Sequence, residues 1–330
     1  MEGPAIRAHR TVTFERRRKP AHPSPAARRA HAGKVRVAPI GISVAALAGT
    51  GSATFANAPA LWAGSVPRLA EAGHKYSRGH AVVLSGPMTA TGAARLSAEA
   101  ALRAGAGLVT VASPADALLV NACHLTTVML RRADGPDALA EMLADTRLNA
   151  ICLGPGLPPG QATAAMVAAA LAAPAAVVLD AGALSSFAGT PGRLAQGIAG
   201  PVVLTPHEGE FARLFGREGD KLADTRRAAA LSGAVVIHKG PDTVIAAPDG
   251  RAAINDNAPP FLATAGTGDV LAGIVTALLA QGLAPFEAAA MAVWLHGEAA
   301  TEAGRGMIAD DLLVALRPTL ARLAERLEAV

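Results

Sequence analysis

Short apolar runs alternate with longer amphipathic stretches from about residue 75 to the C-terminus. The short runs are three to five residues long and consist mainly of Val, Ile, Leu and Ala. Runs without regular polar alternation are typical of strands buried on both faces of a parallel sheet. We therefore predict strands at residues 81–84, 108–112, 150–153, 176–179, 202–204, 235–239 and 243–247.

The stretches between these runs place apolar residues at the spacing of a buried helix face. They predict helices at residues 92–103, 161–172, 208–215, 221–232, 269–280, 285–302 and 308–327. Strands that alternate with helices indicate an α/β fold with a doubly wound, mostly parallel sheet and helices on both faces. In such a sheet, ligands are expected beyond the carboxyl ends of the strands.

The first 56 residues follow a different pattern. Residues 11–14 and 35–40 could each form a strand, but residues 16–32 between them are basic and proline-rich with no helical period. Two isolated strands bury too little surface to fold alone. We expect this segment either to lie against the main domain or to be partly disordered, and we place the main domain at residues 57–330.

The positive charge of the chain is concentrated at its amino end. Residues 1–36 hold ten Lys or Arg and two acidic residues, which leaves −4 for the remainder of a chain whose formal net charge is +4. A mildly acidic body does not offer the basic surface that nucleic acid requires, so no nucleic-acid partner is expected. The basic composition also resembles a targeting peptide, but Pro23, Pro25 and Gly33 would interrupt its helix.

Cysteine content and hydropathy point to a cytoplasmic protein. Cys123 and Cys152 are the only cysteines, and their spacing predicts neither a disulfide framework nor a zinc site. Residues 40–62 form the longest apolar stretch near the start, but Gly, Pro and polar residues dilute it. A membrane-spanning helix is therefore not expected, and neither is a membrane partner.

The most informative motif is the glycine-rich turn Gly266-Thr267-Gly268-Asp269 ahead of a predicted helix. Such a turn directs unpaired backbone N–H groups at the space before the helix and favours a phosphate there. Asp269 stands where a general base could take the proton of a hydroxyl. Taken alone, however, this motif is more often an ordinary helix start with a favourable acidic residue.

Two further segments follow predicted strands and could contact a ligand. Residues 239–243 form a turn in which a lysine offers charge to a phosphate, although a hairpin with a solvated lysine is the ordinary alternative. His207 precedes a helix start at the ligand edge, where Glu210 could help to hold hydrated magnesium or simply complement the helix dipole. We interpret His296, on an apolar helix, as a core residue.

Seven motifs in a fixed order resemble the dehydratase domain of the NAD(P)H-hydrate repair family, whose members have a ribokinase-like fold. The resemblance covers about residues 57–320. Its motifs lie at residues 74–80, 91–109, 153–157, 179–184, 204–211, 239–244 and 263–273.

This resemblance implies ADP-dependent dehydration of (6S)-NADHX and (6S)-NADPHX to NADH and NADPH, with release of AMP and phosphate. ADP would be the co-substrate, Mg²⁺ the cofactor, Asp269 the catalytic base, and a homo-oligomer the expected assembly. The residues implied to contact the NAD(P)HX substrate are Ala93, Gly156, His207 and Asp269. Those implied to bind the nucleotide are Lys239, Gly240, Pro241, Asp242, Thr243 and Gly268. The turn implied to stabilise the transferred phosphoryl group is Gly266, Thr267 and Gly268.

Residues 1–56 resemble the closing strands of the hydrate epimerase domain that precedes the dehydratase in bifunctional members. They are interpreted as a remnant of that domain. The epimerase nucleotide loop and catalytic acid would then lie upstream of Met1, so no epimerase activity is expected from this chain.

Two departures from the family pattern lie near the predicted site. Gly182 stands where many relatives carry an acidic residue, and residues 255–261 differ from the Thr-Gly-Asn form common in relatives. The nearest alternative is a ribokinase-like kinase for a vitamin-precursor alcohol, which would use the same turn. A nucleotide-binding remnant without catalysis is a second alternative, against which the intact Asp269 and its glycine turn argue.

Overall fold

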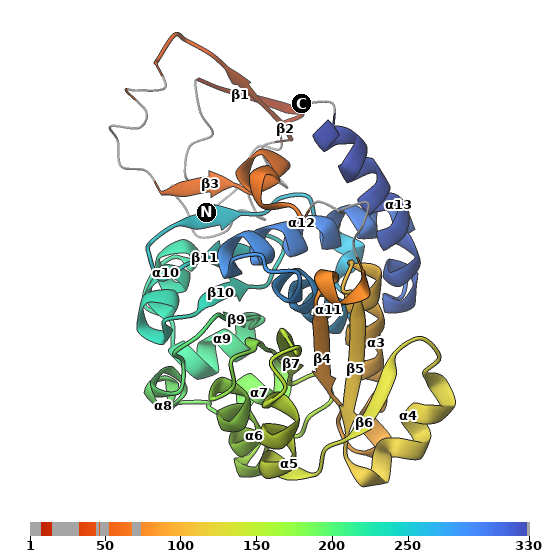
Figure 1. Ribbon diagram of the computed structural model, residues 1–330. Coiled ribbons are helices and arrows are strands. Elements are labelled where there is room, and N and C mark those ends of the chain that lie inside the picture. The colour runs from red at the N-terminus through yellow and green to blue at the C-terminus, as the bar shows by residue number, and fades with distance from the viewer. Residues whose placement is uncertain (1–7, 15–32, 44–45, 47–52, 68–73, 329–330) are drawn as a thin grey trace.

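The computed structural model describes residues 8–14, 33–43, 46, 53–67 and 74–328, and its centre is one large sheet (Figure 1). Its ten strands lie in the order β3-β12-β11-β10-β9-β8-β7-β4-β5-β6. Neighbouring strands are parallel except where β11 meets β10 and β12. The predicted doubly wound, mostly parallel sheet is thus confirmed. Its strands are β3 (Thr54–Ala56), β4 (His80–Leu84), β5 (Leu108–Ser113), β6 (Met129–Arg132), β7 (Ala150–Leu153), β8 (Ala176–Leu179), β9 (Val202–Leu204), β10 (Val235–His238), β11 (Val244–Ala246) and β12 (Ala252–Ile254).

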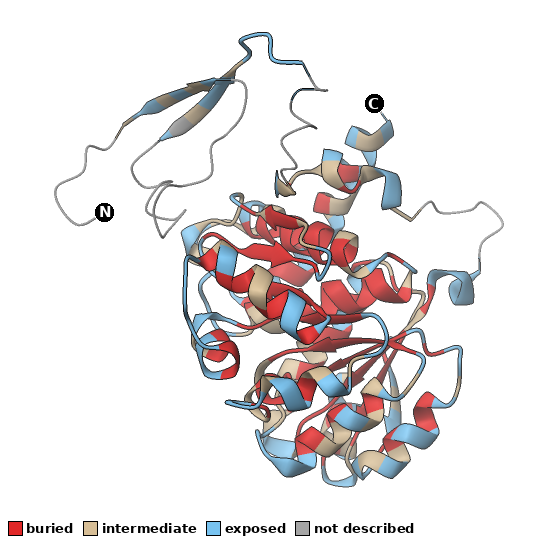
Figure 2. Cartoon of the chain, turned by 90° about the vertical axis from the view of Figure 1, so that its left-hand side faces the viewer, coloured by how far each residue is buried: buried red, intermediate tan, exposed pale blue. Residues whose placement is uncertain are grey.

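Helices cover both faces of this sheet and enclose a separate apolar core on each side. Alternate strand residues divide between the cores, because successive side chains of a strand point to opposite faces. Figure 2 shows the buried strands and inner helix faces between exposed outer surfaces. One face carries α3 (Thr91–Arg103), α11 (Thr267–Ala280), α12 (Pro285–Ala303) and α13 (Ala309–Glu328). The other carries α5 (Gly135–Leu143), α6 (Gln161–Leu171), α7 (Ala181–Ser185), α8 (Pro191–Gln196), α9 (Glu208–Phe215) and α10 (Lys221–Ser232).

The remaining helical segments are short. Helix α4 (Leu118–His124) contacts the edge strand β6. The 3-10 turns lie at Pro59–Leu61, Ala63–Ser65, Lys75–Arg78, Met88–Ala90, Ala115–Ala117 and Pro260–Leu262.

The register of the central strands aligns their carboxyl ends. Leu153 at the end of β7 pairs with Leu179 of β8, which pairs with Leu204 of β9. The loops that follow these strands therefore emerge side by side at one edge of the sheet. This edge is where a doubly wound fold places its ligand site.

The amino-terminal segment contains the two strands that the sequence predicts. β1 (Arg10–Phe14) and β2 (Lys34–Ala38) pair in parallel as a separate two-stranded sheet. In contrast, β3 joins the main sheet beside β12, although it precedes residue 57. Arg226 of α10 anchors this strand by donating to Ala53 O at 3.0 Å and to Thr54 Oγ1 at 2.8 Å.

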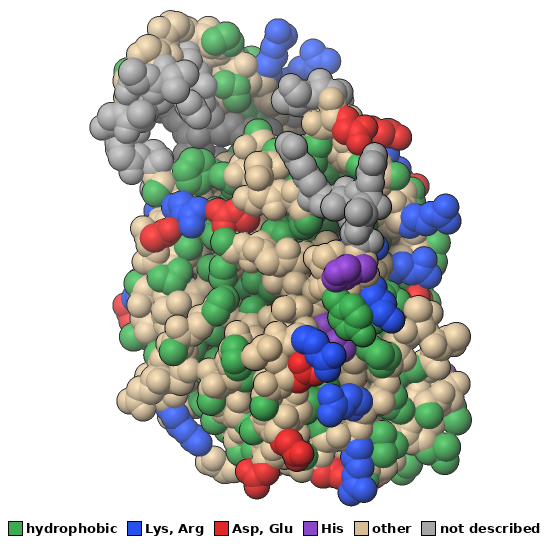
Figure 3. Space-filling model, in the orientation of Figure 1, with side chains coloured by type: hydrophobic (Ala, Val, Ile, Leu, Met, Phe, Trp, Pro, Cys, Tyr) green, Lys and Arg blue, Asp and Glu red, His purple; other side chains and the backbone are tan. Residues whose placement is uncertain are grey.

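The described surface is mixed in charge. On the face shown in Figure 3, basic and acidic side chains are interspersed among apolar and neutral ones. No helix in the described ranges is long and apolar enough to span a membrane.

Candidate active site

The glycine-rich turn forms the start of α11 at the carboxyl edge of the sheet. Gly266 is the N-cap and has φ +83°, a left-handed conformation that glycine adopts readily. No side chain caps the first turn, so its backbone N–H groups remain available to an anion. Thr267 stiffens the turn because its Oγ1 donates to Leu262 O at 3.1 Å and to Thr264 O at 2.9 Å.

Asp269 is partly withdrawn from solvent in the first turn of α11. Ser97 of α3 holds its backbone by donating from Oγ to Asp269 O at 2.8 Å. Burial raises the pKa of the Asp269 carboxyl to about 6, with the negative charge of Asp180 adding to the effect and Lys239 opposing it. A carboxyl tuned to this range is suited to act as a general base near neutral pH.

Lys239 and Asp180 form an ion pair directly in front of this turn. Lys239 follows β10, Asp180 follows β8, and Lys239 Nζ lies 2.8 Å from Asp180 Oδ1. A Cβ on Gly268 would lie 3.2 Å from Lys239 Nζ and 3.8 Å from Asp180 Oδ2. Lys239, Gly268 and Asp269, all predicted site residues, therefore meet in one place.

Asp180 belongs to this cluster, although the sequence did not single it out. The sequence feature that could have identified Asp180 is its position directly after a buried strand, at the edge of the sheet where ligands are expected. The residue that follows, Ala181, has φ +41°, a positive value that among the described residues is otherwise found only at glycine. Local backbone strain of this kind is often retained at functional sites.

The loop after β7 brings the predicted substrate residues Ala93 and Gly156 together. A Cβ on Gly156, which has φ +73°, would lie 3.6 Å from Ala93 Cβ and 2.3 Å from Ala90 O. A Cβ on Gly154 would lie 1.8 Å from Asp180 O, so this loop also packs against the cluster around Lys239. Glycine is required at both positions because the backbones approach so closely.

Glycine at position 182 has a steric explanation. A Cβ at this position would lie only 1.9 Å from Leu157 O, so an acidic side chain would require the loop after β7 to move. The glycine therefore matches the close packing of these two loops.

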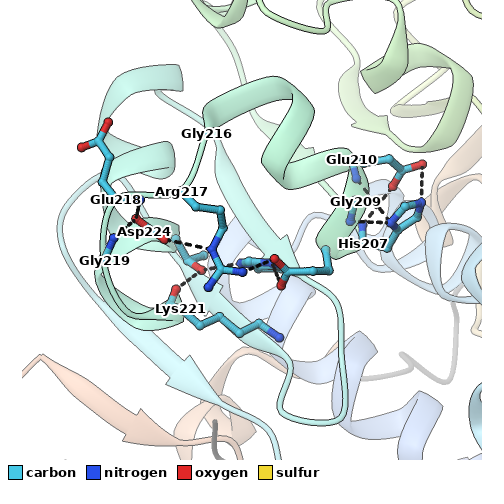
Figure 4. Close-up of polar contacts among 12 residues, drawn as sticks. His207, Gly209, Glu210, Gly216, Arg217, Glu218, Gly219, Lys221 and Asp224 are labelled. Carbon is cyan, nitrogen blue, oxygen red and sulfur yellow. Dashed lines mark hydrogen bonds and ion pairs between the residues drawn. The ribbon is translucent and has the colours of Figure 1, made fainter. Parts of the chain in front are cut away.

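His207 is held at the start of α9 by a reciprocal capping arrangement (Figure 4). Its Nδ1 accepts from Gly209 N at 2.9 Å and from Glu210 N at 3.3 Å, while the Glu210 carboxylate accepts from His207 N at 2.9 Å. Accepting at Nδ1 leaves the ring proton on Nε2, which lies 3.4 Å from Glu210 Oε1. The ring is 55% exposed, so it remains open to a ligand.

Residues 239–243 form a closed loop between β10 and β11. Thr243 Oγ1 donates to Gly240 O at 2.9 Å and accepts from Gly240 N at 3.2 Å. Lys239 N donates to Pro206 O at 2.8 Å, which ties this loop to the segment that carries His207.

His296 is buried on α12, which confirms its interpretation as a core residue. Burial lowers its pKa to about 4, and the ring also faces the backbone of Thr267. The histidine therefore packs against the glycine-rich turn, a neighbourhood that the sequence did not predict.

The fold is of the ribokinase-like class. The structure is similar to that of a ribokinase-like superfamily protein from Enterococcus faecalis, with a TM-score of 0.71 and 24% identity. That likeness covers 82% of this chain and 97% of the other.

The chain belongs to the NAD(P)H-hydrate dehydratase family, whose model matches residues 81–318. It is 39% identical to the bifunctional NAD(P)H-hydrate repair enzyme Nnr of Moorella thermoacetica, over 99% of this chain and 65% of that protein. It is also 39% identical to the ADP-dependent (S)-NAD(P)H-hydrate dehydratase of Neisseria meningitidis serogroup B, over 70% of this chain and 79% of that protein. The chain thus spans somewhat less than two thirds of the length of the bifunctional relative.

A solved structure of the same family is similar in fold. The ADP/ATP-dependent NAD(P)H-hydrate dehydratase from Bacillus subtilis, co-crystallised with ATP and Mg²⁺, is 32% identical with a TM-score of 0.68. The likeness covers 78% of this chain and 94% of that chain.

Proposed function

We propose that this chain catalyses the ADP-dependent dehydration of (6S)-NADHX and (6S)-NADPHX to NADH and NADPH, with AMP and phosphate as the other products. The observation that carries the proposal is the position of Asp269 in the uncapped first turn of α11, facing the Lys239–Asp180 ion pair. The names of the Neisseria and Bacillus relatives support the reaction and its use of an adenosine nucleotide.

The reaction must convert a poor leaving group, hydroxide, into a good one. Asp269 takes the proton of the ring hydroxyl, whose oxygen then attacks the β-phosphorus of ADP. The bond from this phosphorus to the bridging oxygen breaks, and AMP leaves. The ring nitrogen electrons then expel phosphate, and loss of a proton from the neighbouring carbon restores the ring double bond.

Fixed backbone dipoles and one cation stabilise the negative charge that develops on the transferred phosphoryl group. The backbone N–H groups of Gly266, Thr267 and Gly268 stabilise the phosphoryl oxygens, and the Lys239 ammonium shares their charge. Burial lowers the pKa of Lys239, but the carboxylates of Asp180, Glu210 and Asp269 together more than offset this, so the net pKa is raised and the ammonium stays charged.

Magnesium fits this donor set as a nucleotide-bound ion. The structure describes no group of three or more His, Cys, Asp or Glu that could hold a metal. Mg²⁺ needs only one or two carboxylates when substrate phosphates and waters complete its shell. Asp180 and Glu210, whose charges both act on Lys239, are the proposed carboxylates, and the ion would neutralise phosphate charge when bound.

The remaining contacts follow from the two loops. Ala93 and Gly156 are the proposed contacts of the hydrated nicotinamide ring, and the 55% exposed ring of His207 is a further proposed contact of this substrate. Residues 239–243, with Gly268, bind the nucleotide.

The direct test is to incubate the purified protein with NADHX and ADP. We expect absorbance of restored NADH to appear together with stoichiometric AMP and phosphate. A stable phosphorylated product without NADH would instead identify a small-molecule kinase, and the absence of any turnover would favour a nucleotide-binding remnant.

The same assay tests the phosphate donor. In ADP the reacting phosphate is terminal and must reach the turn at residues 266–269. ATP would place its γ-phosphate there, and a displacement of about 1 Å can cost roughly 10²-fold in rate. We therefore expect faster repair with ADP than with ATP, and faster turnover with ATP would refute this donor while leaving the dehydratase reaction in place.

The amino-terminal segment and the cellular context are further parts of the proposal. Residues 1–56 are proposed to correspond to the end of an epimerase domain. The near-complete alignment with the bifunctional relative, against 70% of the chain for the dehydratase of Neisseria, supports this. We also propose a cytoplasmic homo-oligomer.

A further inference from the structure

Lys221 is a buried cation that the proposed mechanism does not use. It lies beside the loop at residues 239–243, which is the proposed nucleotide-binding loop. It is the first residue of α10, next to the charged residues around Arg217 (Figure 4). Its side chain is only 9% exposed, so the ammonium group depends on protein partners.

The partners of Lys221 lie at opposite ends of one loop. Lys221 Nζ donates to Lys239 O at 3.4 Å and to Asp242 Oδ1 at 3.2 Å. A Cβ on Gly240 would lie 2.6 Å from the same nitrogen, so the ammonium group rests directly on the loop backbone. Lys221 therefore connects the two ends of the loop at residues 239–243.

Asp242 depends on this contact. Its side chain is 8% exposed, and Oδ2 is fully buried with no hydrogen-bond partner in the described part of the chain. Removing the ammonium would leave a buried carboxylate without its counter-charge, which is strongly unfavourable. The loop would relieve this by opening to solvent.

We propose that Lys221 is a positioning residue that holds the loop at residues 239–243 in the closed form to which the nucleotide binds. The inference rests on the proposed function for the identity of that nucleotide, ADP. Lys221 would act through Lys239 O and Asp242, without touching the phosphates.

This arrangement predicts an effect on binding and not on chemistry. Lys239 N donates to Pro206 O at 2.8 Å, and this hydrogen bond does not depend on Lys221. The Lys239 side chain should therefore stay in front of Gly268 when the contacts of Lys221 are lost. The rest of the loop would populate open forms. The apparent Kd for ADP then rises, because it equals the intrinsic Kd divided by the fraction of molecules whose loop is closed.

The experiment compares Lys221→Met, Lys221→Arg and a control, Arg322→Met. Arg322 forms a partly exposed ion pair with Glu302 at 2.9 Å on the far part of α13, so its variant removes one cation from a surface pair. We would measure the Kd of ADP by calorimetric titration, and kcat and the KM for ADP with NADHX.

For Lys221→Met we expect the Kd and KM for ADP to rise on the order of 10-fold or more, with kcat at saturating ADP within about threefold of wild type. Lys221→Arg should recover most of the affinity, because a guanidinium can also bridge the carbonyl and the carboxylate. Arg322→Met should bind ADP as the wild type does.

An ADP Kd within about twofold of wild type in Lys221→Met would overturn the inference, as would loss of kcat at unchanged affinity. If Lys221→Met does not fold, Lys221→Gln, which keeps donors without charge, replaces it under the same criteria. Titration with ADP measures binding without turnover. The proposed role of Lys221 and the proposed dehydratase reaction can therefore be refuted independently of each other. A wild type that binds ADP without converting NADHX defeats the proposed reaction alone.

Discussion

Three charged side chains meet around Gly268, and their balance decides when Asp269 can accept a proton. Burial and the negative charge of Asp180 favour the protonated form of Asp269, whereas Lys239 favours the ionised form. The 2.8 Å pair between Asp180 and Lys239 couples these two influences. Changes at single residues here should therefore alter catalysis in separable ways.

Asp269→Asn keeps the shape of the side chain but removes the carboxylate that is the proposed base. We expect turnover to fall by a factor on the order of 10² to 10⁴, with ADP binding largely kept. Rates of NADH formation and ADP titration measure the two effects. A variant that retained more than half of its activity would exclude Asp269 as the base.

The pKa of Asp269 predicts an acid limb in the rate profile. The base is lost as pH falls through about 6, so kcat/KM should decline below that pH. In Asp180→Asn the like charge is gone and Lys239 is unpaired, and both changes lower the pKa of Asp269. The acid limb should therefore move to lower pH.

The matched control for this shift is Asp249→Asn, which removes an exposed carboxylate paired with Arg251 away from the site. Its acid limb should coincide with that of the wild type. An unchanged or upward-shifted limb in Asp180→Asn would contradict the proposed coupling.

At the scale of elements, α11 and α3 pack so closely that their contact leaves no room for a side chain at Gly273. A Cβ there would lie 2.1 Å from Ser97 O and 2.9 Å from Ala100 Cβ. The same helix pair carries the hydrogen bond from Ser97 Oγ to Asp269 O. The spacing of two helices is thereby linked to the position of Asp269, the proposed base.

Gly273→Ala should force these helices apart. We expect a loss of about 1–3 kcal/mol in the free energy of unfolding, although alanine is the better helix former. Denaturant titration measures this loss, and turnover should fall as well because Ser97 moves relative to Asp269. Gly192→Ala in α8, where a Cβ meets nothing within 4 Å, should be neutral or slightly stabilising. Equal stability of both variants would show that the α3–α11 contact is not tight.

At the scale of the whole molecule, the main sheet begins upstream of residue 57. β3 pairs with β12 in parallel, and Arg226 ties it to α10 through Ala53 O and Thr54 Oγ1. The boundary between the amino-terminal segment and the sheet therefore matters for any truncation.

Deletion of residues 1–52 should leave dehydratase activity within about twofold of the full chain, because none of the proposed site residues lies there. Deletion of residues 1–56 should also leave an active protein, but one less stable by about 1–3 kcal/mol, since β3 and its hydrogen bonds are lost. Turnover and thermal unfolding of the two truncations test this. If the shorter deletion is insoluble or inactive, the segment is an integral part of the fold.

Local patterns were sufficient for the buried elements of this fold. The bounds predicted for β7, β8, β9, α9 and α10 agree with the structure, because strands buried on both faces are uniformly apolar and the helices keep a regular apolar face. The sequence missed β3, β6 and β12, which are short or polar, and the short helices α4, α5, α7 and α8. An edge strand such as Met129–Arg132 is defined by its partner strand, not by its own composition.

The sequence by itself also determined the turn at residues 266–269 and the loop at residues 239–243, since glycine and charged residues at strand and helix ends mark them locally. Only the tertiary structure decided which charges meet there. Asp180 and Lys239 are 59 residues apart and become partners because β8 and β10 flank β9 in the sheet. Lys221 meets Asp242 only because α10 packs against β10 and β11. The periodicity of buried positions can be recognised from residues that are close in the sequence. The electrostatics of a site depend instead on the order of the strands in the sheet, and no local sequence pattern determines that order.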